Sequence, residues 1–235
     1  MLKKIKAVLV LQKKEWKTLF LLWITVLGMT AILNCSNAFL FKRFIGQINP
    51  VIAMVFSGIV GFFLLSILST MECFVIIKKA NLKATIRYFL LVIVFPIIAI
   101  LVDLKMVFSA DINILFPESL LFYPTIAFLV EILFHILPLS VLLLMLNSIF
   151  KKENQQKRIW VALLLVALLE PTFQILMDDY LIWAMWLTWI NLYLFNLTQL
   201  LVFKKYGFIP MYICRLVYYL IWHIIWGYFR LELLF

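Results

Sequence analysis

The stretch that decides the fold is Phe122–Phe150, FYPTIAFLVEILFHILPLSVLLLMLNSIF, an apolar run long enough to cross a bilayer. It carries two ionisable residues, Glu131 and His135, one helical turn apart. Residues at i and i+4 share a face of a helix, so both side chains are expected on the same side. Because a charged carboxylate in hydrocarbon costs on the order of a few kcal/mol, such residues usually face the bundle interior. The run therefore predicts a membrane helix with one polar face.

The composition of the whole chain is that of a membrane protein. Its 235 residues are 66% hydrophobic and only 14% charged, whereas soluble domains are about 45 to 50% apolar and about 25% charged. We expect an all-α polytopic membrane protein with about seven transmembrane helices in one bundle. The apolar runs place them at about 18–34, 51–77, 87–103, 122–149, 159–177, 181–203 and 208–229. The expected organisation is a basic interfacial helix over 1–17 and a single membrane domain over 18–235.

Basic residues give the chain a formal net charge of +10 and predict its orientation. They lie in short clusters between apolar runs, where membrane topology and anionic lipid explain them better than nucleic acid does. With the N-terminus inside, sixteen Lys and Arg residues fall on the inner side and four on the outer side. The positive-inside rule then predicts a multi-pass protein of the cell membrane, with a cytoplasmic N-terminus and an external C-terminus.

The sequence gives no signal for a disulfide framework, a metal centre or a cofactor. Its three cysteines are odd in number and share no metal-ligand spacing. A metal site built from Glu131, His135, Glu170 and His223 would draw its two histidines from different helices, without HExxH-like spacing. We therefore expect neither a metal nor a cofactor.

Polar residues within the predicted spans concentrate in the C-terminal half of the chain. Several repeat at helical spacing, so three helices each present a polar face. The candidate catalytic residues are Glu131, His135, Glu170, Gln174 and Arg215, and the candidate binding residues are Asn191, Asn196, Tyr219 and His223.

Two interpretations of this polar set stay open at the level of sequence. In the first, Glu131 or Glu170 pairs with Arg215 and the network simply holds the bundle together, because buried ions need partners. In the second, a glutamate acts as general base on water while a histidine or Arg215 stabilises the developing oxyanion. The two differ in whether a water-accessible pocket reaches both carboxylates.

The order of these faces resembles the CPBP intramembrane proteases, the family of CAAX-processing and bacteriocin-immunity membrane proteins. The family pattern is EExxxR, FxxxH and HxxxN on successive core helices, and the resemblance covers residues 122–229. Val130-Glu131-Ile132-Leu133-Phe134-His135 is similar to EExxxR, with Val130 for the first glutamate and His135 for the arginine. Glu170-Pro171-Thr172-Phe173-Gln174 lies where FxxxH belongs, with Gln174 for the histidine.

The third motif has two alignments. Either Arg215 and Tyr219 take the places of HxxxN, or the motif begins at His223 and puts Gly227 where asparagine belongs. In the family the leading glutamate of EExxxR is thought to activate water with histidine support. Val130 and Gln174 depart from that pattern, and neither Gln174 nor Arg215 can accept a proton as a neutral histidine does.

The resemblance therefore implies a protease scaffold whose catalytic motifs are degenerate. We expect a protein that binds a membrane peptide or protein partner without proteolysis, in a cavity between the fourth, fifth and seventh spans. One alternative is a divergent glutamate-dependent intramembrane endopeptidase. Another is a transporter or channel component, since intramembrane acids and an arginine can line an ion path.

Overall fold

The structure is a computed structural model, and it describes residues 12–71, 74–78, 82–149, 155–177 and 181–235. Within these ranges the chain is helical and forms no strand, as expected for an all-α bundle. Most of the predicted interfacial helix, residues 1–11, lies outside the described residues. Lys13–Lys17 form the first residues of a long helix.

Seven helical stretches are long and apolar enough to cross a membrane, which confirms the predicted number of spans. Three are single helices: α2 (Lys13–Asn37), α4 (Pro50–Thr70) and α10 (Ile182–Tyr206). A fourth is most of α5 (Leu82–Met106). The other three are composite: α6 (Ser119–Val130), η3 (Glu131–Ile136) and α7 (Leu137–Ile149); α8 (Gln155–Val166) and α9 (Leu169–Met177); α11 (Phe208–Tyr219), η5 (Leu220–Trp226) and α12 (Gly227–Leu234). Short helical turns η1 (Ala38–Phe41), α3 (Lys42–Ile45) and η2 (Ala110–Ile112) lie in the connections.

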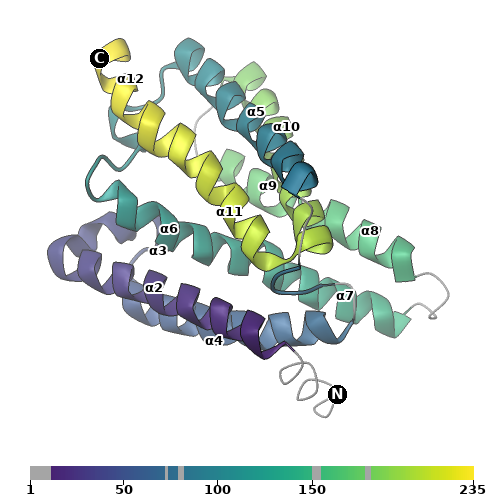
Figure 1. Ribbon diagram of the computed structural model, residues 1–235. Coiled ribbons are helices and arrows are strands. Elements are labelled where there is room, and N and C mark those ends of the chain that lie inside the picture. Colours follow the sequence, from purple (N-terminus) through teal and green to yellow (C-terminus); the bar gives the residue numbers. More distant parts are fainter. Residues whose placement is uncertain (1–11, 72–73, 79–81, 150–154, 178–180) are drawn as a thin grey trace.

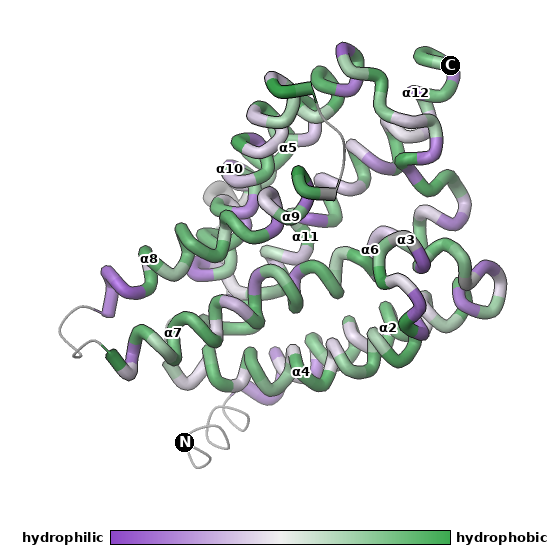
Figure 2. The backbone as a smooth tube through the Cα atoms, turned by 180° about the vertical axis from the view of Figure 1, so that it is seen from behind, coloured by the Kyte–Doolittle hydropathy of each residue, from purple (hydrophilic) through white to green (hydrophobic). Residues whose placement is uncertain are grey.

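The helices form two groups that meet along α6 and α11 (Figure 1). One group contains α2, α4, α6 and α7, and the other contains α5, α10 and α11 with α9 beside α10. Apolar residues cover most of every long helix, and hydrophilic ones gather near helix ends and in connections (Figure 2). This distribution is that of a protein whose outer surface faces lipid.

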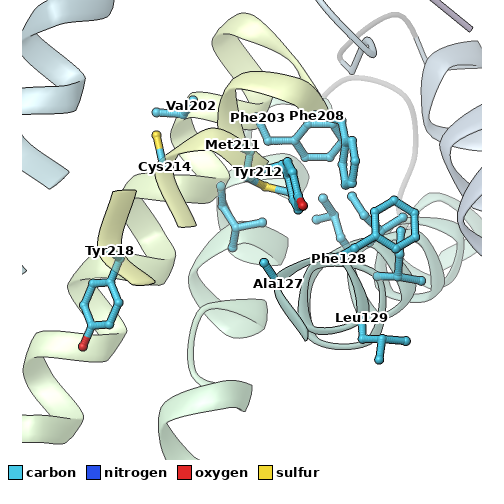
Figure 3. Packing of buried hydrophobic residues seen from close by; sticks show 14 of the residues in the cluster. Ala127, Phe128, Leu129, Val202, Phe203, Phe208, Met211, Tyr212, Cys214 and Tyr218 are labelled. Atoms are coloured by element: carbon cyan, nitrogen blue, oxygen red, sulfur yellow. The ribbon is translucent and has the colours of Figure 1, made fainter. Parts of the chain in front are cut away.

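Close packing within and between the groups relies on glycines and aromatic rings. The ring of Trp23 on α2 lies against Gly58 of α4, and Gly61 of α4 leaves room for Ile132 of η3. Between the groups, buried side chains of α6, such as Phe128, lie near Tyr212 of α11 (Figure 3). The Tyr212 hydroxyl also donates to the Pro124 carbonyl at 2.9 Å, so α6 and α11 are joined by both packing and a hydrogen bond.

The second span is shorter than the sequence predicts, because helix α4 ends at Thr70 rather than near residue 77. Residues 74–78 instead form a non-helical segment beneath the turn between α10 and α11, with Phe74 and Ile76 buried. The Val75 and Ile76 carbonyls accept from the backbone N–H groups of Phe208 and Ile209 at 3.1 and 3.0 Å. These are N–H groups that the first turn of α11 cannot satisfy itself, so the apolar segment acts as a backbone cap.

Two of the composite spans contain a π-helical segment, and each segment carries one of the two histidines. His135 lies in η3 and His223 in η5. In η3 the N–H of Leu137 donates to the Ile132 carbonyl, five residues back, and Pro138 follows with no N–H to restore the α-helical pattern. Single π turns inside α-helices occur frequently at functional sites.

A buried ion pair ties the end of α5 to α12. Arg230 donates from Nε to Asp103 Oδ2 at 2.7 Å and from Nη2 to Asp103 Oδ1 at 2.9 Å, and neither side chain is exposed. Trp226 Nε1 and the Phe108 N–H also donate to this carboxylate, while Arg230 also donates to the Ser109 and Phe108 carbonyls. Both charges therefore lie in the interior as a matched, hydrogen-bonded pair.

We expect Gly207→Ala to destabilise the protein by about 2 kcal/mol or more, because Gly207 has φ +106° and an added Cβ would meet the Ile76 carbonyl oxygen at 2.6 Å. Gly28→Ala is the matched control, since Gly28 lies inside α2 with nothing within 4 Å of an added Cβ. Alanine there should raise stability by about 0.5 to 1 kcal/mol. Reversible SDS unfolding followed by circular dichroism measures both; equal stability of the two variants would contradict the capping role of residues 74–78.

Candidate functional site

Arg215 on α11 is the centre of a buried polar network that joins four helical segments. Its Nη1 and Nη2 donate to the two carboxylate oxygens of Glu170 at 2.7 Å each, a bidentate pair. Its Nε donates to Glu131 Oε1 at 2.6 Å. One guanidinium thus binds a carboxylate from η3 and another from α9. Glu170 lies in the first turn of α9, where the positive end of the helix dipole also favours a carboxylate.

Glu131 has partners on both carboxylate oxygens. Oε1 accepts from Arg215 Nε and also from Gln199 Nε2 at 2.6 Å. Oε2 lies 2.6 Å from His135 Nδ1, so this ring nitrogen is assigned as the donor to an ionised carboxylate. The i, i+4 spacing of Glu131 and His135 is therefore realised as a direct contact.

Two amides of α10 complete the network. Gln199 Oε1 accepts from Arg215 Nη2 at 3.0 Å, and its Nε2 also approaches the Met211 carbonyl at 3.3 Å. Asn196 Oδ1 lies 3.4 Å from the same Nη2, a weaker contact. The centroids of the Phe195 and Tyr219 rings lie 5.5 and 5.8 Å from the guanidinium carbon, within cation–π range.

The network is closed to solvent. Glu131 and His135 are 0% exposed, Arg215 is 1% exposed and Glu170 is 4% exposed. The two carboxylates share a guanidinium, which meets the proximity that a two-carboxylate hydrolase would need. Both carboxylates are buried, so the second requirement, access for water and substrate, is not met.

The other predicted site residues lie around the network rather than in it. Gln174, one turn after Glu170 on α9, is half-buried and makes no hydrogen bond to the network within the described chain. Asn191 Nδ2 donates to the Phe95 carbonyl at 3.0 Å and so ties α10 to α5. Both residues therefore contact the bundle without contacting Arg215.

His223 forms a second polar site on the loop side of the network. Its Nδ1 lies 2.7 Å from Asn113 Oδ1, and its ring stacks on Tyr123 at 4.6 Å. Tyr219 lies between the two sites, with its ring 5.0 Å from His223 and beside Arg215. Gly227, one turn after His223, leaves the space that the Asn113 side chain fills, since a Cβ there would lie 3.0 Å from Asn113. The sequence did not indicate Asn113, which comes from the loop between α5 and α6.

Gln199 is the network residue that the sequence analysis missed. It lies three residues after Asn196, on the same face of α10, so helical spacing could have included it. Asp103 and Arg230 were also missed, because a charge at the end of an apolar run looks the same whether it faces interfacial water or a buried partner.

The described residues contain no group of three or more His, Cys, Asp or Glu side chains arranged to hold a metal ion. Arg215 already binds both carboxylate oxygens of Glu170 and one carboxylate oxygen of Glu131. The guanidinium thus lies where a cation would otherwise bind the two carboxylates. Chemically, the arrangement is suited to holding helices together.

Removing Arg215 should strongly destabilise the bundle, because it would leave two buried carboxylates without a cation. We expect Arg215→Gln to cost about 3 to 5 kcal/mol, the range for breaking a buried ion pair on one side. Arg87→Gln is the control, since Arg87 lies exposed on α5 and should change stability by less than about 0.5 kcal/mol. SDS unfolding in mixed micelles measures both; a cost below about 1 kcal/mol for Arg215→Gln would contradict a network that holds the two helix groups together.

Comparison with known proteins does not assign the chain to a family. The chain matches no family model, no curated protein and no solved structure. The helical architecture and the seven apolar spans identify a multi-pass membrane protein, and any finer function is argued from the site.

Proposed function

We propose that this chain is a non-proteolytic integral membrane protein on a CPBP-like scaffold, which binds a membrane peptide or protein partner without cleaving it. The observation that carries the proposal is that Arg215 forms ion pairs with both Glu131 and Glu170 in a buried network. A general base must reach a water next to the scissile bond. Carboxylates held by a guanidinium and excluded from solvent are poorly placed for that task.

The resemblance to the CPBP family supports the scaffold part of the proposal. The residues that correspond to EExxxR and FxxxH, Glu131 and Glu170, come from successive spans and meet at one guanidinium. Arg215, from the alternative in which the third motif begins at this residue, completes the set. In the other alignment, His223 has Gly227 at the asparagine position and is paired with Asn113 from a loop. The first set joins core helices and the second joins a core helix to a loop, and both depart from the proteolytic residues.

The polar network buries the region between the fourth, fifth and seventh spans where the sequence analysis expected a partner, so the proposed place is instead a hollow at the loop end of the bundle. It has a volume of about 410 Å³ and is lined by residues of the α2 end and of the loop between α5 and α6, among them Asn37, Asn113, Asp111 and Glu118. That volume lies within the range of about 300 to 1,000 Å³ typical of ligand sites. Its two carboxylates favour a partner that presents a basic segment next to its membrane span.

The same proposal includes an orientation in the cell membrane, with the N-terminus in the cytoplasm and the C-terminus outside. Lys204 and Lys205 lie at the end of α10 that faces the inner side under this orientation. Lys204 lies over the Trp160 ring at 4.6 Å, and Lys205 over Tyr88 at 5.2 Å. Lysines held by aromatic rings are suited to the headgroup level of an anionic inner leaflet.

A labelled single-span peptide with a basic flank tests partner binding and proteolysis together. In nanodiscs we expect the peptide to bind and to stay intact, and Glu118→Gln to weaken binding by about 2- to 5-fold, the worth of an exposed charge pair. Fluorescence anisotropy reports binding and mass spectrometry reports cleavage. Cleavage that Glu131→Gln abolishes in a folded protein would refute the non-proteolytic assignment. A peptide that does not bind the protein would refute partner binding, and a peptide that binds the wild type and Glu118→Gln equally well would refute the hollow as the partner site.

Cys35 tests the proposed orientation. It is exposed near the end of α2, whereas Cys214 is buried. In a variant that keeps Cys35 and replaces the other two cysteines by alanine, a membrane-impermeant maleimide should label intact cells. A cysteine-free protein carrying Lys204→Cys should be labelled only after the membrane is opened, and the reverse pattern would invert the assignment.

A further inference from the structure

The buried network contains one more carboxylate than permanent cations. Glu131 and Glu170 both contact Arg215, which is the one guanidinium of the network. The fourth member, His135, is charged only when both of its ring nitrogens carry a proton. With a neutral histidine the network has a net charge of −1 at bilayer depth, a state that costs on the order of several kcal/mol. One additional proton would make the network neutral.

We propose that the Glu131–His135 pair is a binding site for a single proton at the centre of the bundle. The proton on Nδ1 faces Glu131 Oε2 at 2.6 Å, and the exchangeable proton is the one on Nε2. Its arrival converts the pair from a carboxylate with a neutral imidazole to a carboxylate with an imidazolium. Nε2 is fully buried and has no hydrogen-bond partner among the described residues, so this atom is the unsatisfied member of the pair.

The contacts explain why the proton belongs to this pair and not to Glu170. Both oxygens of Glu170 are bound by the two terminal nitrogens of Arg215. Protonating Glu170 would break a bidentate charge-assisted pair, which is among the stronger protein hydrogen-bonding arrangements. Glu131 shares Arg215 through one oxygen and leaves the other to His135.

Among the residues that the structure describes, no neighbouring group supplies the missing positive charge. The titratable side chains of α11 that act on the network electrostatically, besides Arg215, are Tyr212, Cys214 and Tyr219, which are neutral in their ordinary forms near neutral pH. Helices α4 and α7, which pack against η3, contain no ionisable side chain between Pro50 and Thr70 or between Leu137 and Ile149. The histidine of η5, His223, is paired with Asn113 in the other polar site.

The ion pair between Asp103 and Arg230 provides an internal comparison. It contains one carboxylate and one guanidinium, and Asp103 is hydrogen-bonded through both oxygens. This pair is neutral without an added proton. Of these two buried ionic sites, the network of Glu131 is the one that carries an excess carboxylate.

The pH dependence of unfolding tests the proposal, because the folded chain keeps a proton that the unfolded chain releases. An exposed histidine is largely neutral at about pH 8, so the folded state binds one proton more there and stability is lost as pH rises. In mixed micelles, the folding equilibrium constant of the wild type should fall up to about tenfold per pH unit between about pH 7 and 9. Glu131→Gln makes the network neutral with a neutral His135, so its constant should fall much less steeply than that of the wild type over this range.

A double variant separates charge balance from the loss of a hydrogen bond. His135→Gln alone leaves the excess negative charge and should be less stable than the wild type at neutral pH. Adding Glu131→Gln removes that charge, so the double variant should be more stable than His135→Gln at about pH 8, although it lacks another native side chain. A double variant that is less stable than His135→Gln would overturn the proposal.

Counting the protons that the wild type releases on unfolding tests the proposal without requiring that any variant folds. Unfolding in weakly buffered solution at about pH 8, followed with a pH-indicator dye, should release about one proton per chain. Release of none, or a wild-type pH dependence equal to that of folded Glu131→Gln, would exclude a bound proton. These outcomes do not depend on whether the chain cleaves or binds a peptide, so they are separate from the test of the proposed function.

Discussion

The contact between the Arg215 guanidinium and two carboxylates is the constraint on which the membrane core depends. In lipid, helices gain little from hydrophobic burial against one another, so their association relies on packing and interhelical hydrogen bonds. Arg215 contributes such bonds to η3, α9 and α10 at once. Because each of these charges would be costly alone at this depth, the segments that carry them are held in a fixed relation. The two helix groups seen in Figure 1 are joined at this contact.

The number and placement of the spans could be predicted because length and apolarity are local properties of the chain. The second span shows where this reasoning stops. Residues 74–77 are as apolar as the helix before them, yet they are a non-helical backbone cap for α11. Hydropathy measures burial and does not distinguish a membrane helix from a buried extended segment. Gly207 lies between the sixth and seventh predicted spans, at the turn against which this segment packs.

Within the candidate site, the contacts that could be predicted are those between two residues of the same helix. The spacing of Glu131 and His135 fixes a shared face, and the structure realises it as a contact. Which faces meet across helices is tertiary information: nothing local indicated that Gln199 would contact Glu131, although it lies on the face of Asn196. Asp103 and Arg230 are 127 residues apart in sequence, and no local pattern indicates that they pair.

The two buried ionic sites differ in charge balance, and this difference sets what each can do. Asp103 and Arg230 form a matched pair with further donors and acceptors from Trp226 and loop carbonyls, so neither gains from binding another ion. The network of Arg215 is fully hydrogen-bonded at Glu170 but carries an excess carboxylate at Glu131 and an unpartnered nitrogen at His135. A matched pair stabilises one state, whereas an unmatched cluster has a stability that depends on an exchangeable charge. Within one bundle, therefore, the ion pair of Asp103 and Arg230 is suited to fixing the loop end. The central cluster is the part whose stability would depend on the proposed proton.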